Sequence, residues 1–229
     1  MATTEISAES DPRMKIKRAA RRLFAEHGFR SVTVREIAKA AGQKNHGAVG
    51  YYFGSKENLI REIVIDGAQL IEERRNSFLD RIEAEGGPAN VYQAVQAIVL
   101  PSAQFSDEDQ ENGDYFNRFL LLLSLANDDF ITRALDGRWN RGYQRCLQHL
   151  RRLMPDMPPA VKNRRFIFIG SYVGSLLALR EMMLTDKTQA HPSWRSEAML
   201  KDILQTTTAI LEAPLHDPDS PIPDSASRR

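Results

Sequence analysis

The stretch TVREIAKAAGQKNHGAVGYYFGSK, residues 33–56, contains the signals for a short helix, a tight turn and a second short helix. Thr33 is followed three residues later by Glu36, the capping-box pattern that satisfies two orphan amides at a helix N-terminus. The apolar residues of this helix end before Gly42, and glycine tolerates the positive φ that a tight turn needs. A short glycine-rich helix is then expected over residues 46–52.

A further helix is expected on each side of this stretch. Residues 13–27 place apolar side chains on one stripe with basic side chains beside it, and Gly28 is suited to a left-handed cap. Ser55 can cap a long helix over residues 55–85. Three short helices with a tight turn between the second and the third are the layout of a helix-turn-helix, whose recognition helix lies in the major groove of DNA.

The formal net charge of the 229-residue chain is only +1, but the charge is unevenly distributed. Residues 13–56 carry eleven Lys or Arg and two acids, a net charge of +9, whereas residues 57–229 carry a net charge of −5. A basic segment beside an acidic remainder favours a polyanion as the partner of the basic part. The alternative is a solvated cationic surface, on which Arg18, Arg21 and Arg22 would lie.

Candidate DNA contacts gather around the glycine-rich helix. Its small residues would let the backbone approach the floor of a groove, and its N-terminus favours a phosphate or a base acceptor. Tyrosine hydroxyls, and a lysine at the start of the next helix, would reach phosphates. The candidates from this region are Lys44, Asn45, His46, Gly47, Tyr51, Tyr52 and Lys56.

Two of these residues have structural alternatives. His46 either reads a base or only caps and solvates the turn. Tyr51 can pack inward against Phe24 and Leu59, which makes Tyr52 the better phosphate contact. We therefore expect Tyr52→Phe to weaken binding to all DNA and His46→Ala to alter the preference among DNA sequences.

The segment AARRLFAEHGFRSVTVREIAKAAGQKNHGAVGYYFGSKENLI, residues 19–60, resembles the N-terminal part of the TetR (tetracycline-repressor) family of bacterial regulators. The shared pieces are a basic first helix ending in LFAEHGF, then TVREIAKAAG, then a small-residue helix with an aromatic pair, and finally FGSKENL. Two departures from the family pattern lie in the turn and in the glycine-rich helix that follows it. The turn is one residue longer than in many members, and Gly50 stands where tyrosine is frequent.

The resemblance implies a helix-turn-helix DNA-binding domain over residues 12–58 and a helical effector-binding and dimerisation domain over residues 59–213. It implies a homodimer that binds a partly palindromic, double-stranded DNA operator and is released by an unidentified small-molecule effector. By the same resemblance Thr33 and Arg35, at the start of the second helix, join the candidate DNA contacts, although Thr33 serves first as a helix cap.

The rest of the chain also has helical periodicity, which predicts an all-α fold of about nine helices. An acidic loop or a frayed helix is expected over residues 106–114, and the ends, 1–11 and 214–229, have compositions typical of disorder. Beyond the long helix at 55–85, the expected helices are 89–103, 115–126, 128–153, 160–185 and 193–213.

The C-terminal helices suggest an interface and a cavity. Gly170, Gly174 and Ala178 lie four apart on one helix face, so this stripe and the 193–213 helix are the expected dimer contact, with internal packing as the alternative. An apolar effector cavity is expected within residues 89–185, with two sets of candidate residues. The lining candidates are Phe119, Leu122, Trp139, Tyr143, Phe168 and Met182. Candidates for meeting an anionic inducer, or for internal pairing, are Arg118, His149 and Arg180.

Other functional classes have little support in the sequence. The single cysteine, Cys146, allows no internal disulfide, and the N-terminus has no apolar signal region, so a cytoplasmic protein is expected. The longest apolar run, 166–179, is shorter than the roughly 20 residues that cross a bilayer, so no membrane partner is expected. Five scattered histidines and no nucleotide-binding or hydrolase motif predict no metal, no cofactor and no catalysis.

The sequence therefore predicts a ligand-responsive transcriptional repressor that is not an enzyme. A transcriptional activator of the same fold stays open, as does an all-α protein–protein adaptor whose basic head meets an acidic partner. An α-helical enzyme would need a convergent set of titratable groups, which the sequence does not offer.

Overall fold

The computed structural model describes residues 11–107, 115–126 and 128–215. Within these ranges all the regular structure is helical, as predicted. Most of the expected disordered ends and of the acidic loop lies outside the described residues, although Asp11 caps α2 through its side chain. The helices are α2 (Pro12–His27), α3 (Val34–Ala40), α4 (Ala48–Phe53), α5 (Lys56–Ala84), α6 (Val91–Asp107), α7 (Phe116–Ala126), α8 (Asp128–Leu135), α9 (Arg141–Leu153), α10 (Pro159–Thr185), α11 (Pro192–Arg195) and α12 (Glu197–Glu212).

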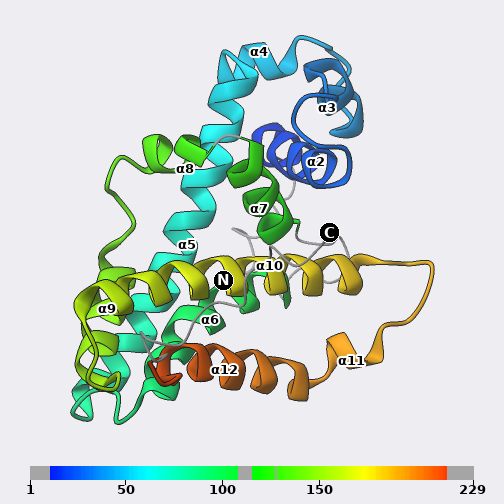
Figure 1. Cartoon of the computed structure of the whole chain (residues 1–229). Coiled ribbons are helices and arrows are strands. Elements are labelled where there is room, and N and C mark those ends of the chain that lie inside the picture. Colours follow the sequence, from blue (N-terminus) through cyan, green and yellow to red (C-terminus); the bar gives the residue numbers. More distant parts are fainter. Residues whose placement is uncertain (1–10, 108–114, 127, 216–229) are drawn as a thin grey trace, which may run out of the picture.

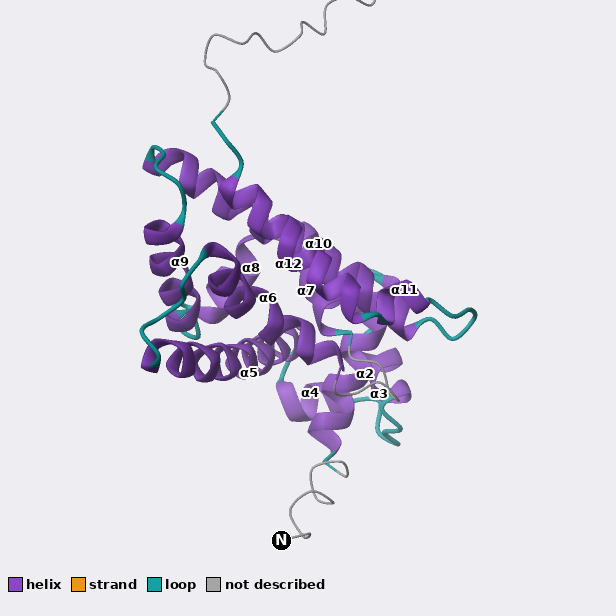
Figure 2. Ribbon diagram, turned by 90° about the horizontal axis from the view of Figure 1, so that it is seen from below, coloured by secondary structure: helices purple, strands orange, loops and turns teal. Residues whose placement is uncertain are grey.

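The helices form a small head and a larger bundle that α5 joins (Figure 1). The head consists of α2, α3 and α4, and α5 runs from it along the bundle. α10 packs against α12, and α6 contacts both of them as well as α5. From below, α10 and α12 lie on one side of the molecule and α5 on the opposite side (Figure 2).

Local sequence signals explain the helix boundaries of the head. The Thr33 hydroxyl accepts from the Glu36 amide, while the Glu36 carboxylate accepts from the Thr33 amide, so the predicted capping box is confirmed. Gly28 and Gly42 both have positive φ, 78° and 67°, as the expected turns require. Ser55 caps α5 by accepting from the Asn58 amide.

The predicted helix over 128–153 is wrong as a single element, because residues 136–140 interrupt it. Asp136, Gly137 and Trp139 all have positive φ, which an α-helix cannot contain. The Asp136–Gly137 pair is a turn signal that the sequence carried. With this break and the separate short α11, the described residues hold eleven helices rather than about nine.

A proline inside α6 is compensated from another helix. Pro101 has no amide hydrogen, so the carbonyl of Ala97, four residues earlier, loses its usual helical partner. The buried Arg75 of α5 donates through Nε to this carbonyl over 3.1 Å. The guanidinium thus ties α5 to the interrupted point of α6.

Two groups of buried side chains form the interior. The first joins the head to the upper part of α5 and to α7 and α8, and Phe24, Ile37, Leu59 and Phe119 in it are inaccessible to solvent. The second lies between the lower part of α5 and helices α6, α9, α10 and α12. Because α7 contributes to the first group, the head is packed partly by a helix of the bundle.

α10 is long and apolar enough, by length and composition alone, to cross a membrane. Within the described residues it packs against α7 and α12, with a third of its apolar window buried. The buried Arg165 of α10 donates to the carbonyl of Leu211 over 2.7 Å and to that of Pro214 over 3.2 Å. These bonds hold the C-terminal end of α12 against α10.

Candidate nucleic-acid interface and bundle cavity

The turn between α3 and α4 is exposed and organised by one asparagine. Lys44, Asn45, His46 and Gly47 are all exposed, and they precede α4 rather than lying on it, because the helix begins at Ala48. The Asn45 side-chain oxygen accepts from the Gly47 amide over 2.8 Å, a local Asx turn. Asn45 therefore fixes the turn, and His46 is left exposed to solvent.

The two tyrosines of α4 face differently from the expectation. Tyr51 is 81% exposed, so the inward packing considered for it is wrong. Tyr52 is half-buried against the core of the head, and its carbonyl accepts from Arg13 over 2.5 Å. The rings meet edge to face with centroids 4.9 Å apart, so Tyr52 supports Tyr51, which is the better placed of the two to reach DNA.

Lys56 has a structural role that its sequence position did not reveal. Its ammonium donates to the carbonyls of Phe29 and Val32, each over 2.5 Å, and lies 5.3 Å from the centre of the Phe24 ring. Partial burial lowers the pKa of the ammonium, opposed by the nearby Glu36 carboxylate. Lys56 thus fastens the loop between α2 and α3 to α5, and its charge is turned inward.

Side chains from α3 and from the turn meet around one shallow hollow of about 320 Å³. Arg35, Lys39 and His46 border it, together with Glu36, whose carboxylate is held by Thr33. The hydrogen bond from the Thr33 amide is the main reason why the pKa of the Glu36 carboxyl is lowered. Lys39 was not among the predicted contacts, although its spacing of four residues from Arg35 places both on one face of a helix.

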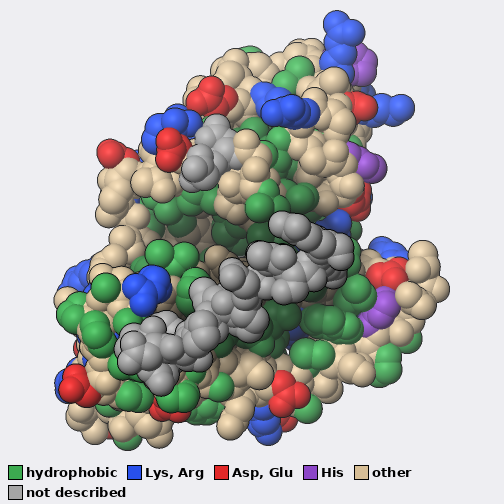
Figure 3. All heavy atoms as spheres, viewed as in Figure 1, with side chains coloured by type: hydrophobic (Ala, Val, Ile, Leu, Met, Phe, Trp, Pro, Cys, Tyr) green, Lys and Arg blue, Asp and Glu red, His purple; other side chains and the backbone are tan. Residues whose placement is uncertain are grey.

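We call the exposed residues Arg35, Lys39, Lys44, His46 and Tyr51 the reading edge. They come from α3, the turn and α4, and every one of them is exposed. Figure 3 shows Lys, Arg and His side chains at the head end of the molecule, while hydrophobic side chains gather over α10. Such an exposed cationic end matches the electrostatic footprint of a nucleic-acid-binding surface.

Several other cations of the head are already paired. Arg13 donates to the Glu62 carboxylate over 2.6 and 2.7 Å, and Lys17 lies 3.0 Å from the same carboxylate and 2.7 Å from that of Asp66. Partial burial raises the pKa of the Glu62 carboxyl, but the hydrogen bonds from both cations outweigh this and lower it. Arg13 and Lys17 therefore fasten α2 to α5.

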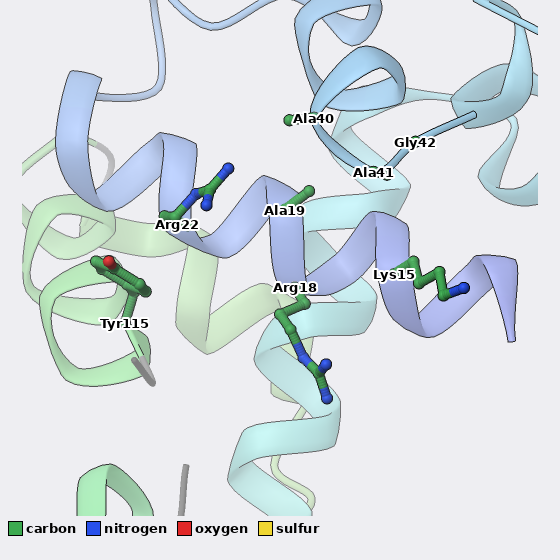
Figure 4. Close-up of a pocket in the computed structure, with 8 residues that line it drawn as sticks. All are labelled: Lys15, Arg18, Ala19, Arg22, Ala40, Ala41, Gly42 and Tyr115. Atoms are coloured by element: carbon green, nitrogen blue, oxygen red, sulfur yellow. The ribbon is translucent and has the colours of Figure 1, made fainter. Parts of the chain in front are cut away.

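A second hollow, of about 360 Å³, lies beside α2 and is lined by Lys15, Arg18 and Arg22 together with residues 40–42 and Tyr115 (Figure 4). The three cationic side chains leave α2 in different directions and do not converge on a point. The hollow consequently lacks the arrangement of donors that would hold one anion. Its cations add to the positive field of the head.

The bundle contains a cavity of about 520 Å³ between α5, α6, α7, α8, α9 and α10, which we call the bundle cavity. α10 contributes a wall of small residues, Gly170, Ser171, Gly174 and Ser175, and these leave the space open. Of the six lining residues that the sequence suggested, only Tyr143 lines it. The others, Phe119, Leu122, Trp139, Phe168 and Met182, are not part of its lining.

These misplacements have a simple cause, since hydrophobicity does not tell which side of a helix faces a gap. Phe119 is fully buried in the core of the head, and Phe168 is 57% exposed. The suggested charged residues are engaged elsewhere. Arg118 donates to the carbonyl of Ala25 over 3.0 Å, and His149 lies 2.7 Å from the Glu83 carboxylate. Arg180 is buried and is not part of the cavity lining either.

A set of hydrogen bonds connects the bundle cavity to the head. Glu181 of α10 is 1% exposed and accepts from the backbone amides of Asn117 and Arg118, over 2.8 and 3.0 Å, at the start of α7. Asn117 also lines the cavity. The Arg118 guanidinium reaches the carbonyl of Ala25 near the end of α2. One short segment of α7 therefore touches the cavity, α10 and the head.

The outer face of α10 carries exposed apolar side chains. Ile167, Phe168 and Leu179 are 67%, 57% and 41% exposed. The small-residue stripe proposed for the dimer contact lies differently: Gly170 and Gly174 line the bundle cavity and Ala178 is buried. Only Ala178 fits internal packing, because a Cβ added at Gly170 or Gly174 would meet no heavy atom within 4 Å, so the part of the stripe in a dimer contact stays a prediction.

Chemically reactive groups are scarce. Burial raises the pKa of the Cys146 thiol to about 11, which keeps it protonated and unreactive at neutral pH. Among the residues that the structure describes, no three His, Cys, Asp or Glu side chains are grouped as a metal ion would need.

Comparisons with known proteins place the head in a family. Residues 16–63 match the family profile described as "Bacterial regulatory proteins, tetR family". The HTH-type transcriptional repressor AcnR of Corynebacterium glutamicum is 41% identical over 64 residues, which cover 28% of this chain. The match spans only 34% of the length of that AcnR.

A longer match involves the HTH-type transcriptional repressor KstR2 of Rhodococcus jostii. It is 42% identical over 148 residues, which cover 57% of this chain and 72% of KstR2. Among solved structures, a TetR family transcription regulator from Marinobacter aquaeolei VT8 superposes with a TM-score of 0.60 over 90% of this chain and 98% of that one. At 12% identity this last similarity shows the fold alone.

Proposed function

The chain belongs to the TetR family of bacterial regulatory proteins, and we propose that it is a repressor of transcription controlled by a small molecule. As a homodimer it binds a partly palindromic operator in double-stranded DNA, and it leaves the operator when an effector enters the bundle cavity. Both named relatives are repressors, which favours repression over activation. The cytoplasm is where such a regulator would meet its DNA.

The reading edge is the observation that carries the proposal. Arg35 and Lys39 of α3 share one hollow with His46 of the turn, so two consecutive elements present donors on one surface. The 81% exposed Tyr51 and the exposed Lys44 extend this surface along α4 and the turn. In a helix-turn-helix, donors of this kind contact phosphates and base edges of the major groove.

The exposed apolar residues of α10 support a homodimer. Ile167 and Phe168 are too exposed to stabilise the monomer, and a second copy would remove them from water. α12 packs beside α10, and its exposed Ala209 is small enough to allow close approach of a second helix. We assign the dimer contact to the outer faces of these two helices.

The short start of α7 offers a route by which an effector changes DNA affinity. A ligand that moves Asn117 must also disturb the two amide bonds to Glu181. Because Arg118 is bonded to α2, the displacement reaches the head. An effector lowers operator affinity only by binding one arrangement of α7 more tightly than the other.

The proposal is tested by selecting duplexes from a random pool with the full-length chain and measuring their affinity by gel shift at fixed salt. We expect a two-fold symmetric sequence, weaker binding to all duplexes for Tyr51→Phe, and an altered preference for His46→Ala. Gln148→Ala, at an exposed position of α9 outside the head and the proposed dimer contact, is the matched control. Selection of no common sequence, or unchanged affinity and preference in both head variants, would contradict the proposal and favour a protein–protein adaptor.

A further inference from the structure

The described residues that line the bundle cavity carry no formal charge. The described residues that line it are aliphatic residues, glycines, serines, one asparagine and one tyrosine. Most of them are apolar, for example Ile71, Ile98, Leu120 and Leu177. The mouth of the cavity is open to solvent at Gly170 and Leu125, but a carboxylate or ammonium ion placed in its buried part loses hydration without gaining an ion pair, which is unfavourable.

The buried charges of the surrounding helices have partners in the protein itself. Arg75 donates to backbone carbonyls of α6, and Glu181 accepts from backbone amides of α7. Glu72 accepts from the Gly142 amide over 2.6 Å and from the Asn76 side chain over 3.0 Å. Each of these groups stabilises a helix, and recruiting one to a charged ligand would break those bonds.

Neutral polar groups remain on the wall. Tyr143, Ser102 and Ser175 bring hydroxyls to it, and Asn117 brings a side-chain amide, which donates to the Ser102 carbonyl over 3.2 Å. Burial raises the pKa of the Tyr143 phenol, so this hydroxyl is neutral and keeps its proton to donate. The wall can therefore form a small number of hydrogen bonds to an uncharged polar group.

From this wall we infer that the bundle cavity takes an uncharged, mainly apolar molecule that carries a hydroxyl or carbonyl group. The inference rests on the proposed function, since it names the chemical class of the effector. A volume of about 520 Å³ lies in the range of pockets that hold drug-sized ligands. An anionic inducer, which the sequence left open, is disfavoured because no arginine or lysine lines the described wall.

Three probes of equal chain length test the charge preference. Binding of 1-decanol, decanoate and decylamine to the full-length chain is measured by titration calorimetry at neutral pH, where the acid and the amine are charged. We expect 1-decanol to bind at least about tenfold more tightly than either charged probe. Equal or tighter binding of a charged probe overturns the inference, and so does the absence of binding by all three.

A glycine of α10 allows the cavity to be filled without disturbing its surroundings. A Cβ added at Gly174 has no heavy atom within 4 Å, so a leucine there projects into the empty space. Gly174→Leu should weaken 1-decanol binding by about tenfold or more while Asn163→Leu, at an exposed position of the same helix, leaves it unchanged. Unchanged binding in Gly174→Leu would place the ligand elsewhere and overturn the inference.

A charge placed at the rim should reverse the preference. Leu125 lines the cavity and is 77% exposed, so a lysine there can meet a carboxylate at little cost to packing. Leu125→Lys should gain affinity for decanoate relative to the neutral control Leu125→Gln. An equal affinity of both variants for decanoate would show that the wall does not set the charge preference.

The outcomes for ligand class and for regulation are separable. The affinity for a duplex selected by the protein is measured with and without 1-decanol. If 1-decanol fills the cavity but duplex affinity is unchanged, the ligand class stands and the role of this cavity in regulation fails. If the protein selects no duplex while the probe series behaves as expected, the proposed repressor function fails and the cavity assignment stands.

Discussion

In the head, the start of α3 and the turn before α4 are held by side chains close by in the sequence, whereas in the bundle the starts of α7 and α9 are held by carboxylates of distant helices. Thr33 and Asn45 accept hydrogen bonds from amides three and two positions away. Glu181 and Glu72 accept from amides 64 and 70 positions away. The head is thus built by local signals that leave its polar side chains outside, while the bundle depends on buried polar groups that hold separate helices together.

The largest effect should come from removing a distant cap. Glu181→Ala leaves two amides at the start of α7 without their acceptor in a site that is 1% exposed. We expect a loss of about 3 kcal/mol in the free energy of unfolding, measured by urea denaturation. Thr33→Ala, which removes a local and exposed cap, should lose only about 1 kcal/mol.

Glu181→Gln serves as the control for this pair, because it keeps one acceptor oxygen and the size of the side chain. Its loss should lie between those of the other two variants. If Glu181→Ala and Thr33→Ala destabilise the protein equally, the contrast between distant and local caps does not hold.

Lys56 is an exception inside the head, because its ammonium donates hydrogen bonds to residues that are distant in the sequence. Lys56→Met removes the donor to the carbonyls of Phe29 and Val32 while keeping an unbranched side chain. We expect a loss of about 2 kcal/mol in the free energy of unfolding because two partly buried carbonyls lose their partner. A variant as stable as the parent would mean that this ammonium is free to serve as a DNA contact after all.

The exposed Lys44 should show the opposite behaviour. Lys44→Met removes a charge that has room to reach a phosphate, so the slope of log affinity against log salt should fall by about 1 with no change in stability. Gel shifts of one selected duplex over a salt series measure this slope. An unchanged slope for Lys44→Met would mean that Lys44 does not contact a phosphate. A reduced slope for Lys56→Met would mean that Lys56 does.

The smallest effect concerns the ion pairs between α2 and α5. The folded-state pKa of the Glu62 carboxyl is lowered, so its contribution to stability is present above the unfolded pKa of about 4.3 and is lost as pH falls through the folded value. After screening by solvent we expect about 0.5 kcal/mol. Urea unfolding at several acidic pH values should show a shallower pH dependence in Glu62→Gln, and an identical dependence would refute this contribution.

The contrast between the two regions also explains what the sequence could predict. The capping box at Thr33, the positive φ of Gly42 and the Ser55 cap are written within a few residues of one another, so they were predictable. The inward turn of Lys56 was not, because its acceptors lie 24 and 27 positions away. The orientation of Tyr51 and Tyr52 depends on the same tertiary packing.

The bundle cavity was the least predictable feature. Apolar periodicity places Phe119 and Phe168 on helices, but the neighbouring helices decide that one is core and the other exposed. The cavity exists because α10 presents Gly170 and Gly174 where larger residues would fill the space. In the sequence these glycines suggested close helix packing, which is the opposite consequence of the same small side chain.

Hydrogen exchange of the full-length chain, with and without a duplex that it selects, tests most directly whether the exposed turn and α4 meet DNA. We expect the amide protection gained on binding to be greatest over residues 43–53 and at the start of α3, with little change along the exposed face of α12. Protection confined to the bundle, with residues 43–53 exchanging as fast as in the free protein, would contradict this expectation.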